Sequence, residues 1–156
     1  MPAPMDIKSL LSPSRTLCGL SEASKKRVLE YVAKVIAQDY PALNPDELFQ
    51  QLISRERLGS TGIGQGIAIP HCRISNCPNT IAALIKLDKP VDFESIDDAP
   101  VDIVFALVVP DEAHEQHLQT LASLAEVFKI NENIEHVRKA NTEQELYDTA
   151  VSLFDK

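Results

Sequence analysis

GSTGIGQGIAIPHC, residues 59–72, is the stretch around which the rest of the chain is arranged. Its first eight residues hold four of the protein's five glycines, and a short apolar segment then leads to Pro70 and His71. Glycine permits backbone conformations that other residues avoid, whereas proline fixes φ. We therefore expect an adaptable loop followed by a short strand, with an accessible imidazole where that strand ends.

Two helices are expected before this stretch. Asn44 caps the nearer one, with proline at its first position and Glu47 three residues after the cap. This helix should end near Arg57 or Leu58, with Gly59 as its terminator. Ser21 is the expected N-cap of the earlier helix, whose apolar positions recur at helical spacing as far as about Tyr40.

Strands are expected on both sides of the glycine-rich stretch. Residues 101–109 form the most apolar run of the chain and predict a central strand buried on both faces. Residues 80–87 predict a second strand, residues 88–90 a turn and residues 91–93 a short edge strand. Residues 16–20 predict a further short strand near the N-terminus.

Three more helices are expected after the central strand. They cover about residues 113–129, residues 131–139, and a last helix that begins with the capping box Thr142 to Glu145. Helices that precede and follow a block of strands favour one α/β domain, in which helices cover a sheet.

Composition excludes several classes of partner. The formal net charge of −8 argues against nucleic acid and anionic lipid, which require clustered basic side chains. No run approaches the roughly 18 apolar residues of a membrane span, and the N-terminus lacks the pattern of a secretory signal. Three cysteines do not suggest a disulfide framework, so we expect a protein of the reducing cytoplasm.

The glycine-rich stretch fits neither common nucleotide-binding motif. No lysine follows the glycines as a Walker loop requires, and a strand follows where the dinucleotide fingerprint needs a helix. A simple turn after a helix stays open, although so many glycines also allow backbone N–H groups to approach a ligand closely. His71 could act as an acid or base, a metal ligand or a nucleophile.

His114 and His117 fall in the first turns of a later helix, on or near one face. They could pack locally, or they could use the positive end of the helix to meet an anion. A metal site would need them with His71, Cys72 and Cys77, but this spacing matches no common zinc motif. A hydrolase is less favoured because no nucleophile elbow is present.

RERLGSTGIGQGIAIPH, residues 55–71, resembles the active-site signature of fructose/mannitol-type enzyme IIA domains of the bacterial phosphotransferase system. Residues 90–110 and the segment HLQTLASLA, residues 117–125, also fit this family, most closely its nitrogen-regulatory branch. The resemblance implies a single domain over residues 1–156, with its core at about 7–153. It also implies a central, mainly mixed β-sheet flanked by helices, as in the mannitol-type fold.

The resemblance also assigns roles to individual residues. His71 would accept a phosphoryl group through Nε2, His117 would hydrogen-bond the phosphoryl group or the ring, and Arg55 would lie beside the phosphohistidine. Arg55 can offer a fork of donors to phosphate oxygens, which suits a reaction that depends on positioning and charge. Thr61 and Gln65 are expected as polar neighbours of the phosphate, and no cofactor or metal is implied.

The residue after the active histidine departs from the family pattern. Glycine is usual there, and this chain has Cys72, which would be strained if the position required positive φ. We expect a harmless substitution, with a redox-sensitive thiol as the alternative.

The implied partner is an HPr-like phosphocarrier, which would donate the phosphoryl group. The implied role is a regulatory switch with targets such as kinases or potassium transport proteins. A sugar-specific IIA component, an adaptor that keeps the fold without phosphoryl transfer, and a metal-binding sensor stay as alternatives.

Overall fold

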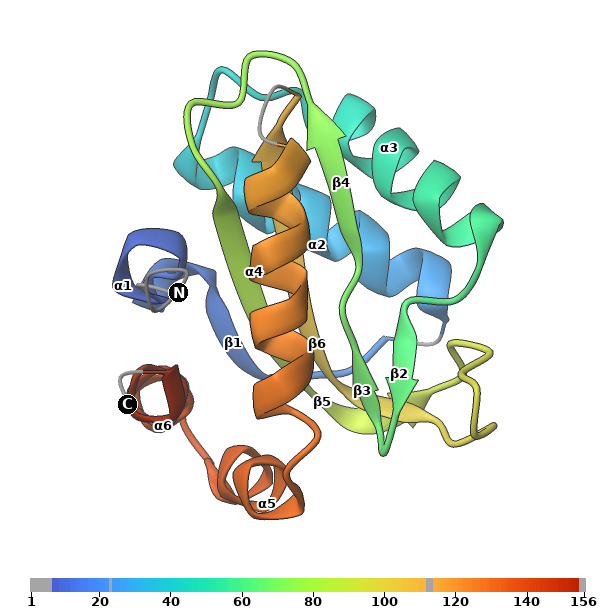
Figure 1. Ribbon diagram of the computed structural model, residues 1–156, viewed down its shortest axis with the longest axis vertical. Coiled ribbons are helices and arrows are strands. Elements are labelled where there is room, and N and C mark those ends of the chain that lie inside the picture. Colours follow the sequence, from blue (N-terminus) through green and yellow to red (C-terminus); the bar gives the residue numbers. More distant parts are fainter. Residues whose placement is uncertain (1–6, 23, 112–113, 155–156) are drawn as a thin grey trace.

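One six-stranded sheet carries helices on both of its faces (Figure 1). The structure, a computed structural model, describes residues 7–22, 24–111 and 114–154, with side chains for all of these except 114–117. The helices are α1 (Ile7–Leu10), α2 (Lys25–Asp39), α3 (Pro45–Leu58), α4 (His114–Val127), α5 (Asn131–Lys139) and α6 (Glu143–Phe154), with a short 3₁₀ turn at Pro13–Arg15. The strands are β1 (Thr16–Leu20), β2 (Gly62–Gly64), β3 (Ile67–Ala68), β4 (His71–Ile74), β5 (Ile81–Val91) and β6 (Val101–Pro110).

The sheet is mixed, as expected. Its strand order is β1-β5-β6-β3-β2, and β4 also pairs with β6. The β5–β6 and β2–β3 pairs are antiparallel, whereas β1 runs parallel to β5, and both β3 and β4 run parallel to β6. The predicted α/β fold class is confirmed.

Strand β6 is the central strand that its apolar sequence predicts. Alternate side chains belong to two separate cores, because successive residues of a strand point to opposite faces of the sheet. One core takes Val104, Ala106 and Val108, and the other takes Ile103, Phe105 and Leu107. All six are fully buried, which confirms a strand covered on both faces.

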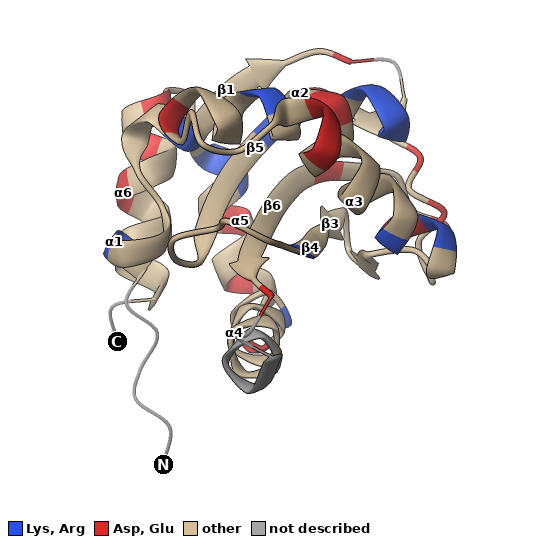
Figure 2. Ribbon diagram, turned by 90° about the horizontal axis from the view of Figure 1, so that it is seen from above, with Lys and Arg blue, Asp and Glu red and all other residues tan. Residues whose placement is uncertain are grey.

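The two cores are closed by different helices (Figures 1 and 2). Helices α2 and α3 lie on one face, whereas α4, α5, α6 and the short α1 lie on the other. On the latter face the ring of Phe105 packs against Phe128 and Phe154, with centroid distances of 6.1 and 5.9 Å. Of the helices in the described ranges, none is both long and apolar enough to cross a membrane.

The start of α3 is as predicted, but the start of α2 is not. The Asn44 side chain accepts hydrogen bonds from the N–H groups of Asp46 and Glu47, at 2.9 and 3.1 Å. Helix α2 begins at Lys25 with Ser24 as its N-cap, so the prediction of Ser21 was wrong. Ser24 lies one turn before the first buried residue of the helix, Val28, and its side chain accepts from the N–H of Arg27.

Strand β5 is longer than the sequence predicts. Residues 88–90 lie within this strand and do not form a turn between two strands, so that prediction was wrong. The pairing with β6 shifts in register between Lys86 and Val91. This irregularity accommodates Pro90, which has no N–H to donate to a sheet ladder.

The glycine-rich stretch forms a tight hairpin and not an open loop. Gly64 pairs with Ile67, and the two turn residues, Gln65 and Gly66, both have positive φ of 58° and 84°. Two positive φ values are what a type I′ hairpin turn requires. Gly66 is packed so closely against Arg138 and Asp102 that a Cβ atom would collide with both.

Candidate functional site

An interruption between β3 and β4 presents His71 at the edge of the sheet. Ala68 pairs with Val104 and His71 pairs with Leu107, so the register along β6 is the same before and after the break. Between the two strands, Pro70 cannot donate to the ladder, although its carbonyl accepts from Leu107 N–H at 2.9 Å. His71 therefore begins a second short strand, whereas the sequence predicted that a strand ends there and a loop follows.

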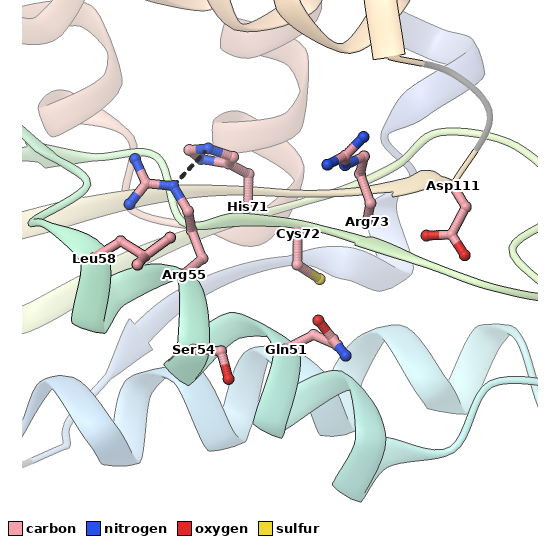
Figure 3. A pocket seen from close by; sticks show the side chains of 8 residues that line it. All are labelled: Gln51, Ser54, Arg55, Leu58, His71, Cys72, Arg73 and Asp111. Carbon is pink, nitrogen blue, oxygen red and sulfur yellow. Dashed lines mark hydrogen bonds between the residues drawn. The ribbon is translucent and has the colours of Figure 1, made fainter.

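A surface pocket of about 570 Å³ opens beside His71. Its lining comes from α3, from β4 and from the end of β6: Gln51, Ser54, Arg55, Leu58, His71, Cys72, Arg73 and Asp111. Figure 3 shows His71 and Arg73 on one side of β4, with the sulfur of Cys72 on the other side, toward α3. The pocket thus joins the predicted His71 and Arg55 with Arg73, a second guanidinium that sequence reasoning missed.

Hydrogen bonds fix the tautomer of His71. The Nε of Arg55 lies 3.1 Å from Nε2 of His71, and the carbonyl of Ile69 lies 2.8 Å from Nδ1. Because a guanidinium only donates, Nε2 must accept, and the proton of the neutral ring therefore lies on Nδ1, from which it is donated to Ile69. The ring consequently directs the lone pair of Nε2 toward Arg55 and the pocket.

The surroundings of His71 also keep its ring neutral. Burial of the half-buried ring lowers its pKa, and the positive charge of Arg55 lowers it further. The hydrogen bond to Ile69 and the negative charge of Glu56 act in the opposite direction, but the net pKa stays below the ordinary value of 6.5. An imidazole that is unprotonated at neutral pH, with Nε2 accessible, can act as a nucleophile.

Arg55 is held by the backbone at the end of its own helix. Its Nη1 donates to the carbonyl of Gly59 at 3.0 Å, one turn further along the chain. Among the described residues, no carboxylate forms an ion pair with this guanidinium. Its charge therefore remains available to an anion that enters the pocket.

The structure does not bring Thr61 or Gln65 into the pocket lining. The Thr61 hydroxyl is buried and donates to the carboxylate of Glu56 at 2.7 Å. Gln65 occupies the hairpin tip, where its N–H donates to Asp97 at 2.9 Å and its carbonyl accepts from Arg138. The contacts seen for both residues hold the hairpin in place, and their expected role as neighbours of the phosphate stays a prediction.

The remaining histidine candidates lie on α4. His114 and His117 belong to the first turn of α4, but the side chains of residues 114–117 lie outside the described part of the structure. The predicted role of His117 stays a prediction. In the rest of the described chain, no group of three or more His, Cys, Asp and Glu side chains could hold a metal ion.

Cys72 lies in regular strand backbone and therefore does not carry the strain that a positive φ would cause. It is not among the residues with positive φ, and its side chain is buried in the core beneath α2 and α3. Burial raises the pKa of the Cys72 thiol to about 12, which keeps it protonated and unreactive. These observations agree with the expectation of a harmless substitution.

Arg73 could have been found from strand alternation. Residues 71 and 73 share a face of any strand that continues past Pro70. The sequence interpretation ended the strand at His71 and therefore gave no reason to bring Arg73 to the site.

The chain is similar to known proteins over almost its whole length. The profile of the family described as "Phosphoenolpyruvate-dependent sugar phosphotransferase system, EIIA 2" matches residues 9–150. A nitrogen regulatory protein of Pseudomonas aeruginosa is 43% identical over 147 residues, which are 94% of this chain and 96% of the relative.

Solved structures show the same fold. The nitrogen regulatory protein IIA-Ntr of Neisseria meningitidis superposes with a TM-score of 0.86 at 33% identity, covering 93% of this chain and 97% of that one. The mannitol IIA of Escherichia coli superposes with a TM-score of 0.72 at 19% identity, covering 89% of this chain and 97% of that one. The chain therefore belongs to the EIIA type 2 family of the phosphoenolpyruvate-dependent sugar phosphotransferase system.

Proposed function

We propose that this protein accepts a phosphoryl group on Nε2 of His71 from an HPr-like phosphocarrier. The observation that carries the proposal is the pair of hydrogen bonds on the ring. Ile69 holds the proton at Nδ1, and Nε2 meets Arg55 at the pocket. Nε2, the nitrogen without the proton, is thereby the atom that an incoming phosphoryl group would reach.

The transfer needs no proton to leave the acceptor atom. The Nε2 lone pair attacks phosphorus in line, the P–N bond of the donor phosphohistidine breaks, and its electron pair returns to the donor ring. The Nδ1 proton of His71 stays in its hydrogen bond to Ile69. Arg55 exchanges its contact with Nε2 for the phosphoryl oxygens, with Arg73 as a second cation, and the reaction depends on positioning and charge.

A regulatory role is the second part of the proposal. The relatives from Pseudomonas aeruginosa and Neisseria meningitidis are named as nitrogen regulatory proteins. Phosphorylation would add a charge of about −1.5 to −2 at a pocket that carries two arginines. A change of this size would alter which proteins bind there, and kinases or potassium transport proteins are the targets we propose, in the cytoplasm. A sugar-specific IIA component is the alternative, because the family is described as part of a sugar phosphotransferase system.

The direct test is phosphorylation with phosphoenolpyruvate, enzyme I and an HPr-like carrier. We expect acid-labile, base-stable phosphate on the native protein and none on His71→Ala. His136→Ala is the matched control, because His136 is exposed on α5 and does not line the pocket. If the native protein takes up no label, the proposal is overturned, and the adaptor without phosphoryl transfer remains as the alternative.

A further inference from the structure

Glu56 is a buried carboxylate next to Arg55 in the last turn of α3. It is only 6% exposed and does not line the pocket. Its oxygens accept from the Thr61 N–H at 3.0 Å, from the Thr61 hydroxyl at 2.7 Å, and from Lys25 Nζ at 3.4 Å. A charge is rarely buried unless hydrogen bonds and an opposite charge compensate for its desolvation, and Glu56 has both.

A chain of hydrogen bonds leads from Glu56 to the ring of His71. The carbonyl of Thr61 accepts from the N–H of Ile69 at 2.9 Å. The carbonyl of the same Ile69 accepts from Nδ1 of His71 at 2.8 Å. Ile69 lies in the break between β3 and β4, where no pairing with β6 fixes it, so Thr61 is its anchor.

Adjacent residues of α3 thus hold the two ends of the segment 59–61. Arg55 binds the carbonyl of Gly59 at the start of the segment, and Glu56 binds Thr61 at its end. Arg55 is the hydrogen-bond donor to Nε2, and Glu56 acts through Thr61 and Ile69 on Nδ1. Both nitrogens of the ring therefore depend on this one helix end.

We propose that Glu56 is a positioning residue for phosphoryl transfer, which selects the Nδ1–H tautomer of His71 through Thr61 and Ile69. The inference rests on the proposed function of His71, but the tautomer can be measured without any phosphoryl donor. A neutral imidazole can carry its proton on either nitrogen, and only the Nδ1–H form presents the lone pair of Nε2 to the pocket. Loosening Thr61 frees the Ile69 carbonyl and makes the other tautomer accessible.

The test compares the native protein with Glu56→Gln and Thr61→Val. Long-range ¹H–¹⁵N spectra of the His71 ring, recorded above its pKa, report which nitrogen is protonated. We expect the native ring to be Nδ1–H and both variants to populate the Nε2–H form. We also expect kcat for phosphoryl transfer to fall roughly 10- to 100-fold, with KM for the carrier unchanged.

Two further variants separate positioning from stability. Thr61→Ser keeps the hydroxyl and should restore what Thr61→Val loses. Asp39→Asn breaks the 2.6 Å ion pair with Arg15 and should lower stability while the tautomer and kcat stay native. If the amide spectrum of Glu56→Gln shows that this variant does not fold as the native protein does, the tautomer and kcat of Thr61→Val decide the test.

The outcomes distinguish the two proposals. A native protein that labels on His71, with variants of unchanged tautomer and kcat, overturns the role of Glu56 and leaves the function intact. A native protein that does not label overturns the function. A shift of tautomer in both variants supports the selection of the tautomer by Glu56 in either case, and together with a fall in kcat it supports the positioning role in phosphoryl transfer.

Discussion

Two arginines bind the backbone of the glycine-rich hairpin, one at each end, and their other partners differ. Arg138 donates to Gln65 at the tip and also forms a two-pronged ion pair with Asp102, with both N–O distances at 2.9 Å. Arg55 donates to Gly59 at the base, and its Nε faces the neutral nitrogen of His71. The arginine at the tip of the hairpin thus has a carboxylate partner, whereas the arginine at the base has a weak partner that an anion can displace.

This difference separates a structural arginine from one that is ready to receive an anion. A bidentate carboxylate satisfies the planar fork of Arg138 and raises the pKa of its guanidinium, so another anion gains little there. Arg55 would lose only its hydrogen bond to a ring nitrogen if it turned to the oxygens of a phosphoryl group. The pocket adjoins Arg55 and not Arg138, in agreement with this division.

The largest expected effect is on phosphoryl transfer. Arg55→Gln should lower the rate of phosphate uptake from the carrier by roughly 100- to 1000-fold, because it removes a preorganised cation from the transition state. Arg138→Gln should transfer at close to the native rate. Single-turnover kinetics with the phosphorylated carrier measure both rates. Equal losses of rate in the two variants would contradict the distinction between the two arginines.

Stability should show the opposite order. Arg138→Gln should lower the free energy of unfolding by about 1 kcal/mol, since the pair with Asp102 is 32% and 23% exposed and solvent screens it. Arg55→Gln should change the same quantity by less than about 0.5 kcal/mol. Urea unfolding followed by circular dichroism gives both values, and a larger loss for Arg55→Gln would assign it the structural role.

The smallest effect is on the pKa of His71. Arg55→Gln should raise this pKa only modestly, because it removes one cause of the lowering while burial, the larger cause, remains in the variant. Arg138→Gln should leave it unchanged. NMR titration of the ring protons measures the pKa, and a shift in the Arg138 variant alone would contradict the assignment.

The same lowered pKa affects stability. Between the folded pKa and the unfolded value of 6.5, the unfolded chain binds more protons than the folded chain. The stabilisation due to a neutral His71 is therefore complete above pH 6.5 and is lost as the pH falls toward the folded pKa. Between pH 7.5 and pH 5.5, the free energy of unfolding should fall less in His71→Gln than in the native protein. An identical fall in both proteins would argue against this contribution.

The sequence predicted those features that local patterns determine. The nine-residue apolar run could only be a buried central strand, and Asn44 with Pro45 marked the start of α3. The signature predicted His71 and Arg55 together, and the structure brings them to 3.1 Å. These features depend on neighbours in the sequence or on one specific motif.

Features that depend on how the chain turns were missed. Gln65 is close to His71 in sequence, but the chain reverses at Gln65 and Gly66, which puts Gln65 at the tip of the hairpin and outside the pocket lining. The β4 strand was missed because Pro70 looked like a stop, although the register on β6 resumes directly after it. Glu56 gave no signal, because a charged residue in the last turn of a helix is usually exposed.

The most direct test of the central claim is the position of the phosphoryl group on the ring of His71. The phosphorylated protein, labelled with ¹⁵N in histidine, can be examined by long-range ¹H–¹⁵N spectra and by coupling to ³¹P. The tautomer set by Ile69 and Arg55 predicts phosphate on Nε2, with the proton retained on Nδ1. Phosphate on Nδ1 or on a residue other than His71 would contradict the account.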